Sequence, residues 1–227
     1  MKKLVVLTGA GISKESGINT FRDTGGTWEQ YDVMDVASIQ GWHKNPSLVL
    51  DFYNQRRKAL DTVVPNLGHK ALVDLESKYD VTIITQNVDD LHERAGSSHI
   101  IHLHGELRKM RSTVYPYAVV DCNSDIEIGQ LCENGGQMRP FIVWFGEDVP
   151  MIDSAVRICQ DADIFIIIGT SLQVYPAAGL IDVVSRSAAK YIIDVELPEM
   201  KNYSNLRGIK APAAIGVPAL VKELLSI

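Results

Sequence analysis

The feature that most constrains the fold is a set of short apolar runs, rich in β-branched residues, that end in small or polar residues. These runs are Lys3–Thr8, Val81–Thr85, Ile164–Ile168 and the shorter Tyr191–Ile193. Apolar runs of this length are typical of strands buried on both faces, as in a parallel sheet. Helical patterns lie between them, at Ser47–Leu60, Leu67–Ser77 and Ala177–Ser187. The alternation predicts an α/β fold with a parallel sheet.

Two regions interrupt this rhythm. Residues 25–66 hold no strong strand and indicate a helical excursion that begins with a Gly-rich loop. Residues 108–139 mix polar, Gly and Tyr residues without a clear period, which predicts a small irregular module. The 227 residues suit a single domain that carries such a module. We expect its core at about 1–27, 67–107 and 140–227, and the module at about 28–66 (helical) and 108–139.

Composition excludes several classes of protein. Hydrophobic residues make up 46% and charged residues 22%, which is typical of a globular chain and not of a disordered or membrane protein. The net charge of −6 argues against direct nucleic-acid binding, although Arg56-Arg57-Lys58 forms a local basic patch. No apolar stretch approaches the roughly 20 residues that cross a bilayer, and Leu4–Leu7 is too short for a signal-peptide core. Three cysteines, an odd number, give no disulfide framework, so we expect a cytoplasmic protein.

The first apolar run passes directly into Thr8-Gly9-Ala10-Gly11-Ile12-Ser13, which is followed by Ser16-Gly17. A strand that enters a Gly-x-Gly turn lets the backbone approach a pyrophosphate, and the following helix N-terminus offers free N–H groups. Gly17 comes six residues after Gly11 rather than three, so this is not the usual dinucleotide fingerprint. The turn alone also fits a tight strand-to-helix connection that binds no ligand.

Two further runs end in residues suited to a nucleotide. Ile164–Ile168 is followed by Gly169-Thr170-Ser171, and Tyr191–Ile193 by Asp194-Val195-Glu196. Ligands of open parallel sheets bind beyond the carboxyl ends of the strands, where hydroxyl groups contact phosphate and an acidic group holds a ribose diol. Three such ends together favour a dinucleotide over a single phosphate.

Five segments resemble the sirtuins, in that family's order, between about Val5 and Pro218. They are Gly9-Ala10-Gly11-Ile12-Ser13-x-x-Ser16-Gly17-Ile18-x-Thr20-Phe21-Arg22, Thr85-Gln86-Asn87-Val88-Asp89-x-Leu91-His92, His102-Leu103-His104-Gly105-Glu106-Leu107, Val143-Trp144-Phe145-Gly146-Glu147 and Gly169-Thr170-Ser171-Leu172. The resemblance implies an NAD-dependent protein-lysine deacylase with a Rossmann-like parallel sheet, helices on both faces and a small inserted module. In such enzymes NAD and an acyl-lysine protein or peptide meet between the two parts. NAD acts as a co-substrate: nicotinamide leaves, the acyl oxygen attacks ribose C1′, and the acyl group ends on ADP-ribose.

The resemblance also implies roles for single residues. His104 is the general base on a ribose hydroxyl, and its ordinary pKa suits proton acceptance at neutral pH. Asn87 anchors a ribose hydroxyl, Asp89 accepts from the nicotinamide amide, and Gln86 orients the ribose. The other implied cofactor-binding residues are Gly9, Ala10, Gly11, Ile12, Ser13, Gly17, Phe21 (covering the nicotinamide side), Arg22 (contacting phosphate or ordering the loop), Trp28, Val88, Gly169, Thr170, Ser171, Asp194 (Asn in many relatives), Val195, Glu196 and Ala213. We interpret His92, His99 and His102 as structural.

The substrate side rests on two stretches. Val143, Phe145 and Gly146 resemble the segment that pairs with the substrate backbone, whereas Trp144 fits core packing equally well. Tyr53 and Arg56 are spaced i, i+3 on a helix, and the same Tyr-x-x-Arg pair occurs in sirtuins that remove dicarboxylic acyl groups. A phenol and a guanidinium can clamp a distal carboxylate, so we hypothesise desuccinylase or demalonylase activity beside deacetylation. The alternative is a solvated basic helix face.

The chain departs from the family where most sirtuins hold a structural zinc with two Cys-x-x-Cys pairs. The first pair falls near Ser112 and Tyr115 and the second on Leu131 and Asn134, with Cys132 one residue out of place. A structural zinc needs four N or S ligands, so we predict no metal site there.

Three other functions stay open. They are a non-catalytic NAD or ADP-ribose binding module, a protein ADP-ribosyltransferase and, less compatible with the glycine spacing, a dehydrogenase. The outcome with NAD distinguishes them from a deacylase, which forms O-acyl-ADP-ribose: a binding module shows no turnover, an ADP-ribosyltransferase forms ADP-ribosylated protein, and a dehydrogenase forms NADH.

Overall fold

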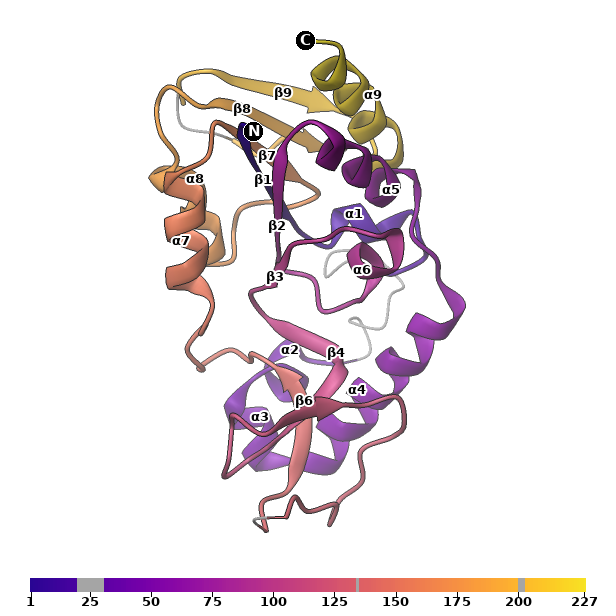
Figure 1. Cartoon of the computed structure of the whole chain (residues 1–227). Coiled ribbons are helices and arrows are strands. Elements are labelled where there is room, and N and C mark those ends of the chain that lie inside the picture. The colour runs from indigo at the N-terminus through magenta and orange to yellow at the C-terminus, as the bar shows by residue number, and fades with distance from the viewer. Residues whose placement is uncertain (20–30, 134, 200–202) are drawn as a thin grey trace.

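The computed structural model describes residues 1–19, 31–133, 135–199 and 203–227 (Figure 1). Within these residues the main unit is a parallel sheet of six strands in the order β3-β2-β1-β7-β8-β9. The strands are β1 (Lys3–Thr8), β2 (Asp80–Thr85), β3 (Ile100–His102), β7 (Ile164–Ile168), β8 (Ala189–Asp194) and β9 (Leu206–Lys210). The predicted α/β fold with a parallel sheet is confirmed.

The four predicted strands all exist, but the two edge strands were not predicted. β1 and β7 have the predicted bounds, whereas β2 is one residue longer than predicted and β8 is three residues longer. The edge strand β3 is partly exposed along its length, and so is β9, in which Arg207, Gly208 and Lys210 are exposed. An edge strand therefore needs no continuous apolar run, and the sequence pattern did not reveal it.

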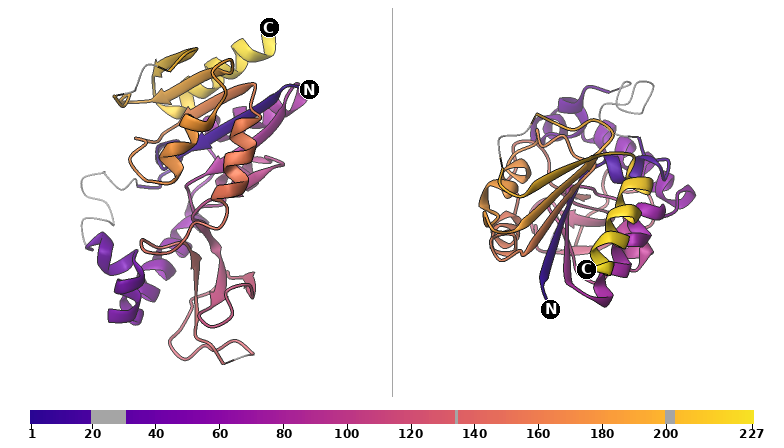
Figure 2. Two further views of the ribbon diagram at one scale, coloured as in Figure 1. Left: turned by 90° about the vertical axis from the view of Figure 1, so that its left-hand side faces the viewer. Right: turned by 90° about the horizontal axis from the view of Figure 1, so that it is seen from above.

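Helices cover both faces of this sheet, as the view from above shows (Figure 2). α5 (Leu67–Asp74) and α9 (Ala213–Ser226) lie on one face, and α7 (Ile152–Gln160) and α8 (Leu180–Val183) on the other. Because side chains alternate along a strand, Leu4 and Val6 pack in the first core and Val5 and Leu7 in the second. This alternation explains why Leu4–Leu7 of β1 and Ile164–Ile168 of β7 are apolar at every position.

The helix predictions are correct for two of three segments. α4 (Pro46–Ala59) is capped by Asn45, whose Oδ1 accepts from Leu48 N–H, and α5 is capped in the same way by Asn66. Each continues into a short 3₁₀ turn, Leu60–Thr62 and Leu75–Ser77 respectively. The predicted helix Ala177–Ser187 was too long: α8 ends at Val183, because Val184 is buried with an extended backbone (ψ 136°).

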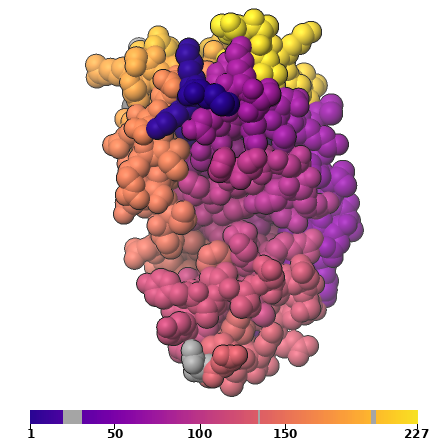
Figure 3. All heavy atoms as spheres, viewed as in Figure 1, coloured from indigo at the N-terminus to yellow at the C-terminus, as the bar shows by residue number. Residues whose placement is uncertain are grey.

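A smaller unit lies below the sheet in Figure 1 and combines helices with an antiparallel sheet. Its helices are α2 (Val33–Val36), α3 (Ile39–Lys44) and α4, and its strands β4 (Gly105–Ser112), β5 (Val119–Asp121) and β6 (Met138–Ile142) pair in the order β5-β4-β6. The space-filling view places the N-terminus at the opposite end of the molecule from this unit (Figure 3). The helical prediction for residues 28–66 agrees with the described part. The prediction of an irregular 108–139 was wrong where β4, β5 and β6 form: charged residues of β4 are partly buried, and Arg139 of β6 is buried.

Two short helices, α1 (Gly11–Lys14) and α6 (Leu91–Ala95), follow β1 and β2. A third core, with Phe52, Tyr53, Leu107 and Trp144 among its members, fills the small unit. None of the helices in the described residues has the length and apolarity that a membrane crossing requires.

Candidate functional site

The carboxyl ends of β1 and β7 meet where the strand order reverses, which is the ligand-binding position of open α/β sheets. Gly9 N–H donates to Ile168 O at 3.0 Å, and Gly11 N–H to Gly169 O at 2.8 Å. A Cβ on Gly9 would lie 2.7 Å from Gly169 O, and one on Gly11 would lie 2.5 Å from Gly169 Cα. Gly169 itself has φ +62°. The two turns therefore require glycine, and they expose backbone where a phosphate could approach.

A buried polar layer joins this turn to the loop after β2. The Asn87 side-chain amide donates to Gly9 O and to Ser13 Oγ, each at 3.1 Å. Ser13 Oγ in turn donates to Asp89 Oδ2 at 2.9 Å. Burial raises the pKa of Asp89, and the hydrogen bonds from Leu91 N–H and Ser13, which lower it, do not outweigh the burial. Four residues predicted to bind the cofactor, Gly9, Ser13, Asn87 and Asp89, thus form one connected group.

Gln86 links the same loop to the end of β7. Its Nε2 donates to Thr170 Oγ1 at 3.1 Å, and that oxygen also accepts from Leu172 N–H. The loops after β1, β2 and β7 are therefore tied to one another by side chains of the predicted motifs.

Two buried histidines lie beneath this layer. Thr8 Oγ1 donates to Thr85 Oγ1 at 2.8 Å and has no second hydrogen, so the His92 Nε2, 3.1 Å away, must be the donor to Thr8. The His69 ring lies 4.9 Å from the His92 ring. Burial lowers the pKa of His69 to about 4 and that of His92 well below its ordinary value. Both rings are buried and neutral at pH 7.

All four carbonyl oxygens of residues 85–88 accept a hydrogen bond from the segment 102–107. Thr85 O accepts from Leu103 N (2.9 Å), Gln86 O from His104 Nδ1 (3.1 Å), Asn87 O from His102 Nδ1 (3.2 Å) and Val88 O from Leu107 N (2.8 Å). The loop that carries Gln86, Asn87 and Asp89 is consequently fixed by its backbone, and the two histidines supply half of the donors.

His104 is held with one nitrogen and presents the other. Its Nδ1–H donates to Gln86 O, which leaves Nε2 as the basic nitrogen, with no bond to any described residue. Burial lowers the pKa of His104, and the Gln86 carbonyl opposes this only in part, so the ring is neutral at pH 7. Gly105 follows with φ +83°, and a Cβ there would run into the carbonyl oxygen of Phe141. A neutral, oriented imidazole is what a general base requires.

The small unit carries a second group of buried polar contacts. Tyr53 (3% exposed) and Trp144 (2% exposed) are joined by a hydrogen bond of 3.0 Å from the indole Nε1 to the phenol oxygen. The Arg139 guanidinium carbon lies 3.3 Å from the centre of the Trp144 ring, and Arg139 pairs with Glu147 at 2.7 Å. Burial raises the pKa of Tyr53 to about 12, so its phenol is neutral. Trp144 is a core residue, but one with a specific polar partner.

The three cations of the predicted basic patch have different environments. Arg57 is buried and donates to Leu107 O and Asn54 Oδ1, and Lys58 pairs with Asp125 at the surface. A single solvated basic face is therefore wrong for this stretch.

Arg56 is partly buried, and its guanidinium carbon lies 5.5 Å from the centre of the Phe52 ring. Burial lowers the pKa of Arg56, whereas the Tyr53 and Asp89 groups raise it. Asp89 acts on Arg56 through its charge, so Arg56 lies on the side of α4 that is near the loop after β2.

The other predicted residues lie around this centre. Val143 N–H donates to His104 O at 2.9 Å. Phe145 N–H donates to Ala37 O and Phe145 O accepts from Ile39 N–H, so Phe145, which is 45% exposed, has its side chain left for contact with a substrate. Gly146 is exposed, with φ +91°. Asp194 accepts from Glu196 N–H at 3.1 Å, and Val195 and Glu196 are exposed.

The remaining members of the predicted cofactor set fall into four groups. Ala10, Gly11, Val88 and Ser171 are partly buried, and Ile12, Ser13 and Ala213 (the first residue of α9) are buried. Gly17 is exposed with φ +98°. Phe21, Arg22 and Trp28 lie outside the described residues.

The donor set at the family's zinc position does not fit a structural zinc. Ser112 Oγ accepts from Val114 N–H, from Tyr115 N–H and from the Cys132 thiol at 3.1 Å. Leu131 and the Tyr115 side chain are exposed and offer no suitable ligand, and Asn134 lies outside the described residues. The serine hydroxyl thus organises this turn with hydrogen bonds.

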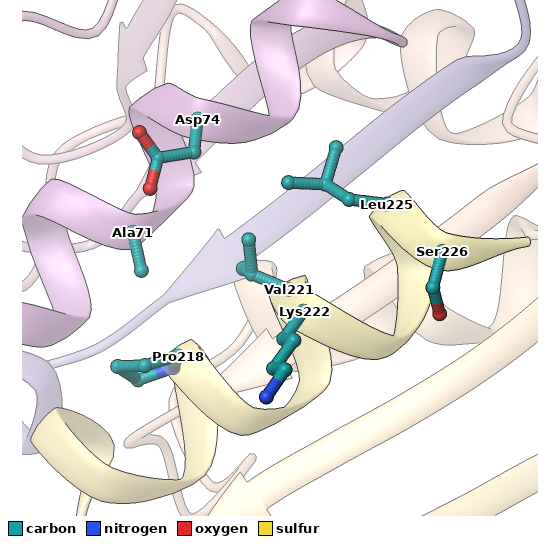
Figure 4. A pocket seen from close by; sticks show the side chains of 7 residues that line it. All are labelled: Ala71, Asp74, Pro218, Val221, Lys222, Leu225 and Ser226. Atoms are coloured by element: carbon teal, nitrogen blue, oxygen red, sulfur yellow. The ribbon is translucent and has the colours of Figure 1, made fainter.

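A groove between α5 and α9 lies away from the site. It is lined by Ala71, Asp74, Pro218, Val221, Lys222, Leu225 and Ser226 (Figure 4). Asp74 lies shortly before β2 begins, so the groove is near the amino ends of the strands and contributes nothing to their carboxyl ends.

Known proteins resemble this chain along its whole length. Residues 9–176 match the model of the Sir2 family. A Helicobacter pylori protein named NAD-dependent protein deacylase is 52% identical over 227 residues, covering 100% of this chain and 97% of its own. A Bacteroides thetaiotaomicron protein of the same name is 52% identical over 231 residues, covering 99% and 98%.

Solved structures agree with these relatives. A complex of a Sir2 homologue with NAD is 38% identical, with a TM-score of 0.89, covering 99% of this chain and 90% of that one. A Sir2 mutant with a deacetylated p53 peptide and 3′-O-acetyl ADP-ribose is 29% identical, with a TM-score of 0.79 and coverage of 99% and 92%.

Proposed function

The chain belongs to the Sir2 family and is an NAD-dependent protein deacylase, and we propose that it prefers lysines bearing dicarboxylic acyl groups. Succinyl and malonyl are the groups meant, with acetyl removed beside them. The acyl group passes to ADP-ribose, and nicotinamide is released. The observation that carries the preference is the buried Tyr53–Trp144 hydrogen bond beside Arg56.

The residues present fit NAD at the carboxyl ends of the strands. The close glycine contacts at Gly9, Gly11 and Gly169 leave backbone without Cβ atoms, which suits a pyrophosphate. Asn87 and Asp89 would hold the ribose and the nicotinamide amide, and Gln86 would orient the ribose from its bond to Thr170. Bound there, NAD supplies the ribose carbon that accepts the acyl oxygen.

His104 supplies the base. Its Nδ1–H is committed to Gln86 O, so only Nε2 can take the proton of a ribose hydroxyl. The lowered pKa keeps that nitrogen unprotonated at neutral pH. The neighbouring Val143 N–H bond to His104 O ties the base to the segment that would bind the substrate backbone.

The acyl preference follows from the direction of the Tyr53 hydroxyl. Trp144 Nε1 can only donate, so the phenol oxygen accepts from it and its own hydrogen is left to be donated. Arg56 adds a positive charge three residues along the same helix. A donating phenol and a guanidinium together bind a carboxylate with charge-assisted hydrogen bonds. An acetyl group has no carboxylate to use them.

Mass spectrometry of acetyl-, malonyl- and succinyl-lysine peptides, with and without NAD, tests this proposal. We expect faster NAD-dependent loss of succinyl or malonyl than of acetyl, with O-acyl-ADP-ribose as product. The Arg56→Met variant should lose about tenfold to a hundredfold in kcat/KM for the succinyl peptide, because one charge-assisted contact contributes about 1.5–3 kcal/mol.

Lys58→Met is the matched control, since Lys58 lies two residues away and pairs with Asp125 at the surface. Undiminished succinyl turnover by Arg56→Met would refute the proposed role of Tyr53 and Arg56 in binding the acyl carboxylate. Labelled protein in place of O-acyl-ADP-ribose would favour ADP-ribosyl transfer, and binding of NAD without turnover would favour a binding module.

We further propose that no zinc is needed for folding, since Ser112 organises the turn where the family holds the metal. We expect metal analysis of the purified protein to find no zinc, and we expect a chelator to leave the unfolding temperature unchanged.

A further inference from the structure

Two histidines of the His102-Leu103-His104 segment point to the same loop. Side chains alternate along an extended chain, so Leu103 is fully buried while the two rings face the loop after β2. His104 bonds to the Gln86 carbonyl and His102 to the Asn87 carbonyl. His102 thus holds the backbone of the residue whose side chain joins Gly9 to Ser13.

The second nitrogen of His102 has a different partner. Its Nε2 lies 2.6 Å from Glu93 Oε1, while Nδ1 lies 3.2 Å from Asn87 O. Both partners only accept, and a neutral imidazole has a single N–H. Either neutral tautomer would therefore set a lone pair against an oxygen. The imidazolium form alone satisfies both contacts.

We propose that His102, held by Glu93 as an imidazolium with two donated hydrogen bonds, is a positioning residue for the NAD site. It acts through Asn87: the bond to the Asn87 carbonyl sets the backbone, and the backbone sets the amide that reaches Gly9 and Ser13. This inference rests on the proposed placement of NAD against Asn87.

The charges that surround the ring agree with this state. Burial lowers the pKa of His102, but the hydrogen bond and charge of Glu93, with Glu106 and the Asn87 carbonyl, outweigh it and leave the pKa raised. The charged and titratable groups that act on the ring are Glu93 and His92 on α6, Glu106 on β4, and Asp89 in the loop after β2, while Lys109 on β4 acts on Glu93.

The same contacts argue against a metal, although Glu93, His102 and Glu106 are the one metal-like cluster among the described residues. An imidazolium has no lone pair for a metal ion, and Glu106 is already paired with Lys109 at 2.9 Å.

The two histidines are therefore needed in opposite states. His104 must be neutral, so activity falls as the pH drops through its lowered pKa. His102 must be charged, so activity falls again as the pH rises through its raised pKa. The pH profile of kcat/KM for NAD should be bell-shaped, with its acid limb set by the titration of His104 and its alkaline limb by that of His102.

Glu93→Gln tests the proposal with little risk to folding, because the Glu93 side chain is 41% exposed. The glutamine still accepts a hydrogen bond but removes the charge, so the alkaline limb should move down by on the order of one pH unit. The acid limb should stay in place. Glu223→Gln, which removes the same charge from a surface pair with Arg207, is the matched control and should leave both limbs unchanged.

His102 variants give a second measurement. In His102→Asn the amide nitrogen stands near the position of Nδ1 and does not titrate, so activity should be partly retained without the alkaline limb. His102→Leu should raise the KM for NAD more than it lowers kcat, with about a tenfold to hundredfold loss in kcat/KM. Calorimetric NAD binding and circular dichroism separate this loss from unfolding.

An alkaline limb that Glu93→Gln leaves in place would overturn the positioning role. Asn87→Ala separates that failure from failure of the proposed NAD placement. If Asn87→Ala binds NAD as tightly as the wild type does, the placement itself is wrong.

Discussion

The sheet unit and the small unit are built on different principles. At the sheet, the site depends on a fixed backbone: two glycine turns are in contact, and the four carbonyls of residues 85–88 all accept hydrogen bonds, half of them from histidine side chains. In the small unit it is made by buried side chains, with Arg57, Arg139, Tyr53 and Trp144 each in a polar contact inside an apolar core. The proposed cofactor end should therefore tolerate few changes of backbone, whereas single side chains should alter the proposed acyl preference.

The largest effect should follow from a change at the glycine turns. In Gly11→Ala the new Cβ meets the backbone of Gly169, which cannot move aside as a side chain would. We expect NAD affinity and the turnover of every acyl peptide to fall together, by on the order of a hundredfold. Calorimetry and steady-state kinetics measure this.

Gly179→Ala is its matched control. A Cβ there has only ordinary contact with the Tyr175 ring, so activity should be unchanged. If Gly11→Ala altered the acyl preference and not the overall rate, the proposed division between the two units would fail.

An intermediate effect is expected on stability, in the small unit. Glu147 bonds to Arg139, Arg111 and Trp144 N–H, so Glu147→Gln leaves a buried guanidinium without its counter-charge. The free energy of unfolding should fall by about 3 kcal/mol. Denaturant unfolding measures this loss, and hydrogen exchange should place it in β4 and β6 rather than in the parallel sheet.

The pH dependence of that pair has a definite sign. Burial raises the pKa of Glu147, but Arg139, Trp144 N–H and Arg111 outweigh it and leave the pKa lowered. The pair therefore stabilises the fold above the ordinary carboxyl pKa and loses its contribution as the pH falls through the lowered value. Equal acid sensitivity of wild type and Glu147→Gln would contradict this account.

The smallest effect should be the most selective. Trp144→Phe keeps the aromatic ring but removes the N–H that orients the Tyr53 hydroxyl. We expect kcat/KM for the succinyl peptide to fall about fivefold, which corresponds to about 1 kcal/mol for one hydrogen bond, with little change for acetyl.

Tyr53→Phe and the double variant complete a cycle that isolates the pair. If the hydroxyl acts through Trp144, the double variant should be no worse than Tyr53→Phe alone. Additive losses would mean that the two residues act independently.

The central strands, and the strand ends at which the motifs lie, could be predicted from the sequence alone. A strand buried on both faces must be apolar throughout, so β1 and β7 could be predicted to the residue. Parallel strands present their carboxyl ends at one edge, so the motifs at Gly9, Asn87 and Thr170 could be expected to meet there.

The edge strands, the antiparallel sheet and the polar partners depend instead on contacts between distant parts of the chain. Local periodicity does not report an edge strand such as β9, which is half exposed and partly charged. Nor does it pair Trp144 with Tyr53, which are 91 residues apart, or show that Arg57 is buried while Lys58 is at the surface. His102 shows the reason most plainly. Its charge depends on two acceptors, Glu93 and the Asn87 carbonyl, which the fold alone brings to its two nitrogens.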